Sequence, residues 1–200
     1  MPMQSAIQPA FRDAVRDSQS VFRLAMRAVA SPGQILHLEA HLAPPAPLLA
    51  PAAALLLTLC DFETTIWLDP PLAGRSDVAE FLRFHTGARL VASAADAAFA
   101  VIADPARMPA LAAFAQGTPD YPDRSATLIV QVDTLVADGW TLEGPGIRKT
   151  ARLSAAPLPA DFIAQLRANR ASFPCGVDIV FATATSLAAL PRSVRLMETA

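Results

Sequence analysis

The chain has 200 residues, of which 53% are hydrophobic and 17% charged, and its formal net charge is −2. No run of basic residues is present, which argues against nucleic acid and against a membrane surface as partners. A chain of this length can bury a large core without a disulfide or structural metal, so we expect one domain over 1–200, with loose tails at 1–10 and 196–200. The low charged fraction predicts that another subunit covers part of the surface.

Cysteine usage and the first residues indicate the cell compartment. Cys60 and Cys175 lie far apart and form no CxxC pair, as expected of two reduced thiols. The N-terminal segment MPMQSAIQPAFRDAVRDSQ carries charges where a secretory leader has its apolar core. Together these features predict a cytoplasmic protein.

The first predicted helix follows this N-terminal segment. Asp17 or Ser18 is expected to cap it, and the apolar residues Phe22, Met26 and Val29 recur at helical spacing. A Ser-Pro-Gly sequence then ends the helix.

Strands and helices alternate in the next part of the chain. The apolar window 42–60 is long enough for a membrane span, but prolines interrupt its first half, so we expect only a short buried helix from Pro51 to Cys60. The other patterns predict strands at 35–41, 64–69 and 99–104 and helices at 77–84 and 108–115.

The last third of the chain is rich in strand patterns. The segments 127–135 and 140–144 are expected to form an antiparallel hairpin, because the Asp138-Gly139 pair between them favours a tight turn. Pro159 is expected to open a helix that runs through Leu166. Two further strands, joined by a short turn, are predicted at 176–183 and 186–192. The element order predicts a three-layer α/β domain with a mixed, largely buried sheet and helices on both faces.

A Gly-Pro-Gly sequence before the only lysine is one candidate ligand site. The backbone N–H groups near Gly144 and Gly146 could hold a phosphate, with Arg148 or Lys149 adding positive charge. Pro145 removes one of these donors, so a sharp structural turn is the preferred interpretation. The chain contains neither a Walker loop nor a dinucleotide fingerprint.

The histidines give little indication of a metal site. His37 and His41 are four residues apart, but in a strand this separates them by about 13 Å, too far for one ion. His85 follows Arg83 near the end of the helix at 77–84, where it either contributes to a ligand site or caps the last carbonyl groups. We favour the capping role, and expect no metal.

Cys175 and Asp178 lie at the start of a predicted strand. Cys175 has no histidine near it in the sequence, so a buried, inert thiol is favoured over a nucleophile. Asp178 stands in an apolar strand and needs a partner, which Arg192 on the next strand could supply. We interpret this pair as structural.

Six segments in order carry a resemblance to a known family: FRLAMRAVASPG (22–33), LLTLCDFETTIWL (56–68), FLRFHTGA (81–88), LEGPGI (142–147), FPCGVDIVFAT (173–183) and LPRS (190–193). The chain resembles the H subunit of the bacterial carbon-phosphorus lyase complex, the PhnH family, from about residue 11 to 195. The resemblance implies a subunit that works with the G, I and J proteins in phosphonate breakdown. That complex exchanges the adenine of ATP for a phosphonate, and its iron-sulfur chemistry belongs to the J subunit.

The resemblance also implies a fold similar to the large domain of pyridoxal-phosphate-dependent transferases, without the cofactor. It transfers no catalytic residue to this sequence. Our hypothesis is therefore a homodimeric scaffold without a cofactor, docked on the other subunits. Two alternatives remain open: a module that binds a nucleotide or phosphonate, and a pyridoxal-phosphate enzyme that uses Lys149.

Overall fold

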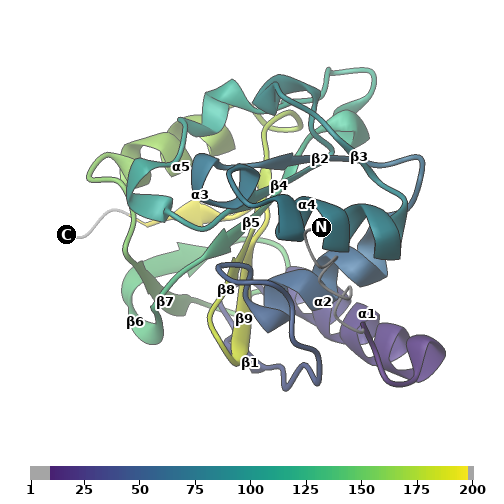
Figure 1. Cartoon of the computed structure of the whole chain (residues 1–200). Coiled ribbons are helices and arrows are strands. Elements are labelled where there is room, and N and C mark those ends of the chain that lie inside the picture. Colours follow the sequence, from purple (N-terminus) through teal and green to yellow (C-terminus); the bar gives the residue numbers. More distant parts are fainter. Residues whose placement is uncertain (1–9, 198–200) are drawn as a thin grey trace, which may run out of the picture.

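The computed structural model describes residues 10–197. Within this range a mixed seven-stranded sheet forms the centre of the molecule, in the order β1-β9-β8-β5-β4-β2-β3 (Figure 1). Its strands are β1 (Leu36–His37), β2 (Thr65–Leu68), β3 (Arg89–Leu90), β4 (Phe99–Ile102), β5 (Thr127–Gln131), β8 (Asp178–Ala182) and β9 (Ser186–Leu190). Strands β3, β2, β4, β5 and β8 run parallel, and β9 pairs antiparallel with β8 and β1. The predicted mixed sheet is confirmed.

The central strand β5 shows why two layers must cover the sheet. Leu128, Ile129 and Val130 are all fully buried. Because side chains alternate along a strand, Ile129 joins the apolar core on one face, while Leu128 and Val130 join a second core on the other face. Both faces of the sheet therefore need a cover of apolar side chains.

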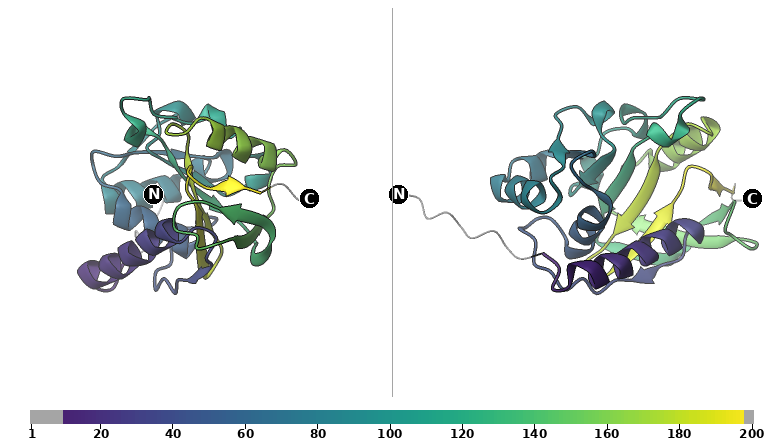
Figure 2. Two further views of the ribbon diagram at one scale, coloured as in Figure 1. Left: turned by 180° about the vertical axis from the view of Figure 1, so that it is seen from behind. Right: turned by 90° about the vertical axis from the view of Figure 1, so that its right-hand side faces the viewer.

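Four helices cover the first face. These are α1 (Ala14–Ala30), α2 (Ala50–Leu59), α3 (Pro70–Ala73) and α4 (Ser76–Thr86). Helix α2 packs against both α1 and α4, and α1 runs along the periphery in both views of Figure 2. The helices expected at 51–60 and 77–84 are confirmed within two residues at each end.

The helix predicted from the spacing of Phe22, Met26 and Val29 is confirmed, but its predicted start was wrong. The helix begins at Ala14, because Asp13 accepts a hydrogen bond from the backbone N–H of Arg16 (3.0 Å) and so acts as the N-cap. The stripe of Phe22, Met26 and Val29 is exposed. The small face with Val21, Ala25 and Ala28 is buried instead, since a helix packs closely where its side chains are small.

The second face is covered by α5 (Phe162–Ala171), by short 3-10 turns and by a separate three-stranded sheet. This small sheet has the order β10-β6-β7, and Figure 1 shows it on the opposite side of the centre from α1. Its strands are β6 (Thr134–Glu143), β7 (Ala151–Ala156) and β10 (Arg195–Leu196). Trp140 of β6 and Phe162 of α5 pack with their ring centres 5.9 Å apart. Sequence patterns did not predict this sheet.

The predicted hairpin across Asp138-Gly139 was wrong. Strand β5 lies in the large sheet, whereas β6 runs without a break through residues 138–139 and pairs with β7. The pairing register shifts between Val136 and Trp140, and Gly139 has a φ of 93°. The glycine therefore forms a β-bulge, which needs the same positive φ as a tight turn.

Four more sequence expectations differ from the structure. The strand expected at 35–41 extends only over Leu36–His37. The segment 108–115 is not an α-helix; the 3-10 turns of the described chain are Ala94–Asp96, Pro105–Arg107, Leu111–Ala113 and Pro122–Arg124. Pro109 lacks the N–H group that a continuous helix needs there. Helix α5 begins at Phe162, later than Pro159, and extends to Ala171. Residues 195–196 pair with β6, so that part of the expected tail is ordered, and residues 1–9 and 198–200 lie outside the described range.

Asn169 joins α5 to the start of β8. Its side-chain N–H group donates to the Val177 carbonyl (2.9 Å) and its oxygen accepts from the Val177 N–H (2.8 Å), in a buried position. Replacing Asn169 with Ala leaves both backbone groups without partners, which costs about 2 kcal/mol of unfolding free energy. Urea denaturation should show this loss. The control Arg167→Ala changes an exposed residue of the same helix and should stay within about 0.5 kcal/mol.

Candidate functional site

The carboxyl ends of the neighbouring parallel strands β2 and β4 form a topological switch point. Open α/β sheets most often bind their ligands at such a point. The chain leaves β2 toward α3 and α4 on the first face, and leaves β4 toward the 3-10 turns on the second face. Connections that diverge in this way open a crevice between neighbouring parallel strands. Here the crevice has a volume of about 240 Å³ and is lined by Asp69, Pro70, Pro71, Asp104 and Arg107.

Asp69 closes the inner end of this crevice with its own carboxylate. One carboxylate oxygen accepts hydrogen bonds from the N–H groups of Ala103 (2.7 Å) and Asp104 (2.8 Å), at the end of β4. The other oxygen accepts from the Leu72 N–H at the start of α3 (3.4 Å). Backbone N–H groups in this position could bind a phosphate. The side chain of Asp69 therefore occupies the place of an anionic ligand.

The charge of the crevice also disfavours an anion. Asp69 is only 2% exposed, and its burial raises the pKa of the carboxyl group above 3.8, although the N–H bonds from Asp104, Ala103 and Leu72 oppose this rise. Arg107 is the cation that lines the crevice, and it already pairs with Asp104 at 3.0 Å. Both acids could have been found from the sequence, because each is the last residue of a predicted strand, 64–69 or 99–104.

The Gly-Pro-Gly sequence forms a tight turn. The Ile147 N–H donates to the Gly144 carbonyl (3.1 Å), and Gly146 has a φ of 81°, which is typical of a type II turn with proline at its second position. A Cβ atom on Gly146 would overlap the carbonyl oxygen of Ala30 at the end of α1. The glycine thus has a packing role, and a ligand role for Gly144, Gly146 and the exposed Arg148 stays a prediction.

Arg83 and His85 lie in the last turn of α4, away from that glycine turn. Gly87, with a φ of 70°, ends the helix by donating its N–H to the Arg83 carbonyl. The ring of His85 packs edge-on against Phe81 and Phe84, with ring centres 4.7 and 4.9 Å apart. The Gly144–Gly146 turn instead lies beside Ala30, Pro32 and the segment 193–194. The predicted ligand residues therefore fall into two separate groups.

The structure brings Asp178 and Arg192 together. The Arg192 guanidinium lies 2.6 Å from the Asp178 carboxylate. The side chain of Arg192 is 15% exposed and that of Asp178 is 27% exposed. Arg192 also donates to the carbonyl oxygens of Pro122 (2.7 Å) and Pro174 (3.4 Å). The arginine thereby ties the ends of β8 and β9 to two loops, as a structural pair does.

The remaining candidate residues, the histidines and cysteines, do not form a common site within residues 10–197. No group of three or more His, Cys, Asp or Glu side chains in this range could hold a metal ion, and His37 and His41 are exposed. Cys60 is buried, which raises the pKa of its thiol to about 12, and Cys175 is free and partly buried. None of the helices described here is both long and apolar enough to cross a membrane.

Four polar side chains near the ends of strands, those of Asp69, Gln131, Asn169 and Arg192, bond to the backbone of the same chain. Gln131 is a further example, since it accepts from the Leu49 N–H (2.7 Å) and donates to the Pro47 carbonyl (3.0 Å). With Asp69, Asn169 and Arg192, it joins loops to strand ends. The fold and its sites thus define an α/β protein whose buried polar groups support its own architecture.

Comparison with known proteins identifies the family. A family model described as bacterial phosphonate metabolism protein (PhnH) matches residues 9–197. A protein of Rhizobium meliloti (strain 1021), described as alpha-D-ribose 1-methylphosphonate 5-triphosphate synthase subunit PhnH, is 40% identical over 198 residues, which cover 98% of each chain. The chain belongs to the PhnH family of phosphonate metabolism proteins.

The buried carboxyl of Asp69 makes stability depend on pH. Its pKa is raised in the folded state, so the folded protein holds this proton at pH values where the unfolded chain has released it. The unfolding free energy of the native protein, relative to that of Asp69→Asn, should therefore fall as pH rises from about 4 to about 7. Urea denaturation across this range measures the difference. A rise would mean that the three N–H donors outweigh the effect of burial.

The Asp178–Arg192 pair should contribute more to stability than an exposed pair. Replacing Arg192 with Ala removes the partner of a largely buried carboxylate and should cost about 2–3 kcal/mol of unfolding free energy. The matched control is Arg195→Ala, which breaks an exposed pair with Glu143 (3.3 Å) and should cost less than about 1 kcal/mol. Thermal or urea denaturation compares the two. Equal losses would contradict this account of the pair.

Proposed function

We propose that this chain is a single-domain subunit of an alpha-D-ribose 1-methylphosphonate 5-triphosphate synthase and acts in phosphonate catabolism. The observation that carries the proposal is the end-to-end match with the Rhizobium meliloti subunit, at 40% identity over 98% of both chains. Such a match extends over the whole domain rather than over a single motif.

The subunit acts as a scaffold in this proposal, and the chemistry takes place on other chains. Asp69 already fills the anion position at the crevice, and Arg107 is paired with Asp104. A triphosphate or a phosphonate is strongly anionic, so a crevice with two carboxyl groups and one paired arginine suits it poorly. The substrate is therefore bound mainly by partner subunits.

The partners in this proposal are a second copy of the chain and the G, I and J subunits, in the cytoplasm. The mixed sheet covered by helices also fits a fold similar to the large domain of pyridoxal-phosphate-dependent transferases, used here without the cofactor. The alternative of a pyridoxal-phosphate enzyme gains no support, because Lys149 lies exposed beyond the Gly-Pro-Gly turn. A nucleotide or phosphonate module is disfavoured by the acidic crevice.

Co-expression tests the subunit assignment. The tagged chain, produced together with the G, I and J proteins of the same complex, should retain all three through affinity and size-exclusion chromatography. The purified chain alone should not exchange the adenine of ATP for methylphosphonate. It should also show no imine absorbance after addition of pyridoxal phosphate. Elution of the chain apart from the other three proteins, or turnover by the isolated chain, would contradict the proposal.

A further inference from the structure

The carboxylate of Asp69 binds two backbone N–H groups at the end of β4 as a free anion would. Its Oδ2 atom accepts hydrogen bonds from the consecutive N–H groups of Ala103 (2.7 Å) and Asp104 (2.8 Å). Neither of these N–H groups donates to a backbone carbonyl within residues 10–197. Successive N–H groups that point at one oxygen form an anion-binding concavity. We call these two groups the N–H cradle, and the side chain of Asp69 is the anion that occupies it.

The backbone around Asp69 is held in place by bonds that do not involve the carboxylate. The Asp69 N–H donates to the Val101 carbonyl of β4 (3.0 Å), and the Asp69 carbonyl accepts from the Ala73 N–H of α3 (2.8 Å). The bond from the Leu72 N–H to the carboxylate is long (3.4 Å), and this N–H also donates to the Asp69 carbonyl (3.0 Å). Removal of the carboxylate therefore leaves the N–H cradle as the main group without an acceptor.

The crevice of about 240 Å³ gives a ligand access to the N–H cradle. Asp69 itself lines the crevice, so the space that its carboxylate fills is continuous with it. Pro70 and Pro71 of the lining have no N–H group. The other two charged residues of the lining, Asp104 and Arg107, pair with each other at 3.0 Å. Without the Asp69 carboxylate the lining carries one acid and one arginine, whose charges balance, so an anion is no longer repelled.

We infer that the ends of β2 and β4 form a binding site for small oxyanions, and that Asp69 is an intramolecular ligand that closes it. Because the carboxylate is attached to the chain, it competes with free carboxylates and phosphates at a high effective concentration. One consequence rests on the proposed function: in a complex that handles a triphosphate and a phosphonate, Asp69 keeps their anionic groups off this subunit. The closed site itself is a property of the chain alone.

Removal of the intramolecular ligand tests the inference on the purified chain. Asp69→Ala keeps the Cβ atom and lacks only the carboxylate, which formate can replace. Asp69→Gly also lacks the Cβ atom, and acetate replaces both. At about ten times its Kd, the matching anion should raise the Tm of its variant by about 3–5 °C relative to the same concentration of chloride. The native chain, whose N–H cradle is occupied, should show no such rise.

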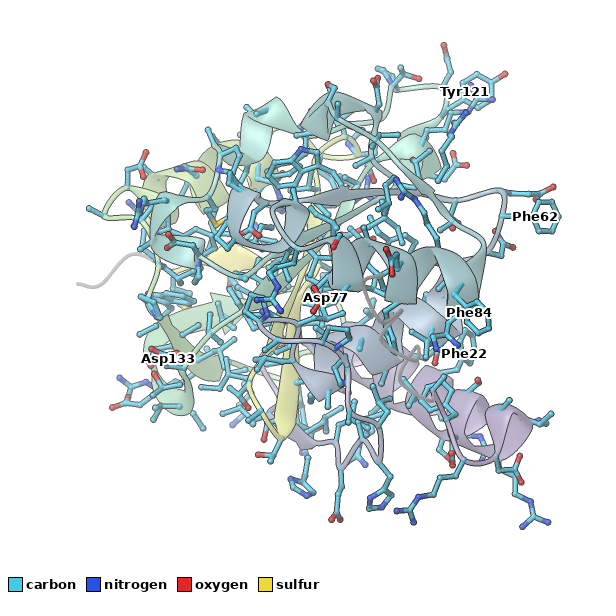
Figure 3. The ribbon with its side chains drawn as sticks, in the orientation of Figure 1. Phe22, Phe62, Asp77, Phe84, Tyr121 and Asp133 are labelled. Carbon is cyan, nitrogen blue, oxygen red and sulfur yellow. The ribbon has the colours of Figure 1, made fainter. Side chains whose placement is uncertain are left out.

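Two variants serve as matched controls. Asp69→Asn keeps an oxygen that can accept from the N–H cradle, so formate should not stabilise it. Asp133→Ala removes an exposed carboxylate that follows β5 and lies beside the small sheet (Figure 3), and formate should again have no effect. Circular dichroism checks the fold of each variant. If Asp69→Ala is unfolded in chloride, the measurement becomes the recovery of folded protein on addition of formate.

Inorganic phosphate tests what Asp69 excludes. It should stabilise Asp69→Ala but not the native chain, because the space of the missing carboxylate opens into the crevice. Stabilisation by formate without any by phosphate would overturn the exclusion of phosphate groups.

The inference as a whole is overturned if formate neither stabilises nor refolds Asp69→Ala and acetate does neither for Asp69→Gly. It is also overturned if the native chain or Asp69→Asn responds to formate as strongly as Asp69→Ala. These measurements need no partner protein, so they stand apart from the co-expression experiment, whose failure would affect the proposed function alone.

Discussion

The burial of β5 on both of its faces is the constraint on which the rest of the structure depends. A parallel strand with neighbours on each side satisfies its backbone within the sheet, but its side chains alternate toward two opposite faces. Ile129 therefore requires an apolar layer on one face, and Leu128 and Val130 require another on the opposite face. The helices α1, α2 and α4 provide the first layer, and α5 with the small sheet provides the second.

This double cover leaves the ends of the strands as the places where backbone groups would lack partners. Side chains solve that problem here: Asp69 accepts from three N–H groups, Gln131 binds the loop before α2, and Asn169 binds the segment before β8. In many α/β enzymes, ligands use the same backbone groups at the switch point. In this PhnH-family chain they serve the fold, which agrees with a role in assembly.

Local sequence patterns correctly predicted those helices and strands whose pattern is compatible with a single kind of element. Helix α2 and strands β2, β8 and β9 follow from apolar runs bounded by Pro, Asp and short turns. The hairpin across Asp138-Gly139 was wrong, because a bulge and a tight turn both need a glycine with positive φ. The pair of Asp178 and Arg192 followed from adjacent strands, whereas the bonds of Asp69 depend on strands far apart in sequence. The stripe of Phe22, Met26 and Val29 indicated a helix but not which way it faces, since sequence does not distinguish a stripe buried in the core from one that faces outward.

The large sheet ends on both sides in strands of two residues, β1 and β3. So short an edge offers few free N–H and C=O groups, and it cannot guide a long strand from another molecule into register. Growth of the sheet from one molecule into the next is thus blocked at both borders. A protein built in this way can carry many apolar residues in a crowded complex and still avoid open-ended stacking into fibres.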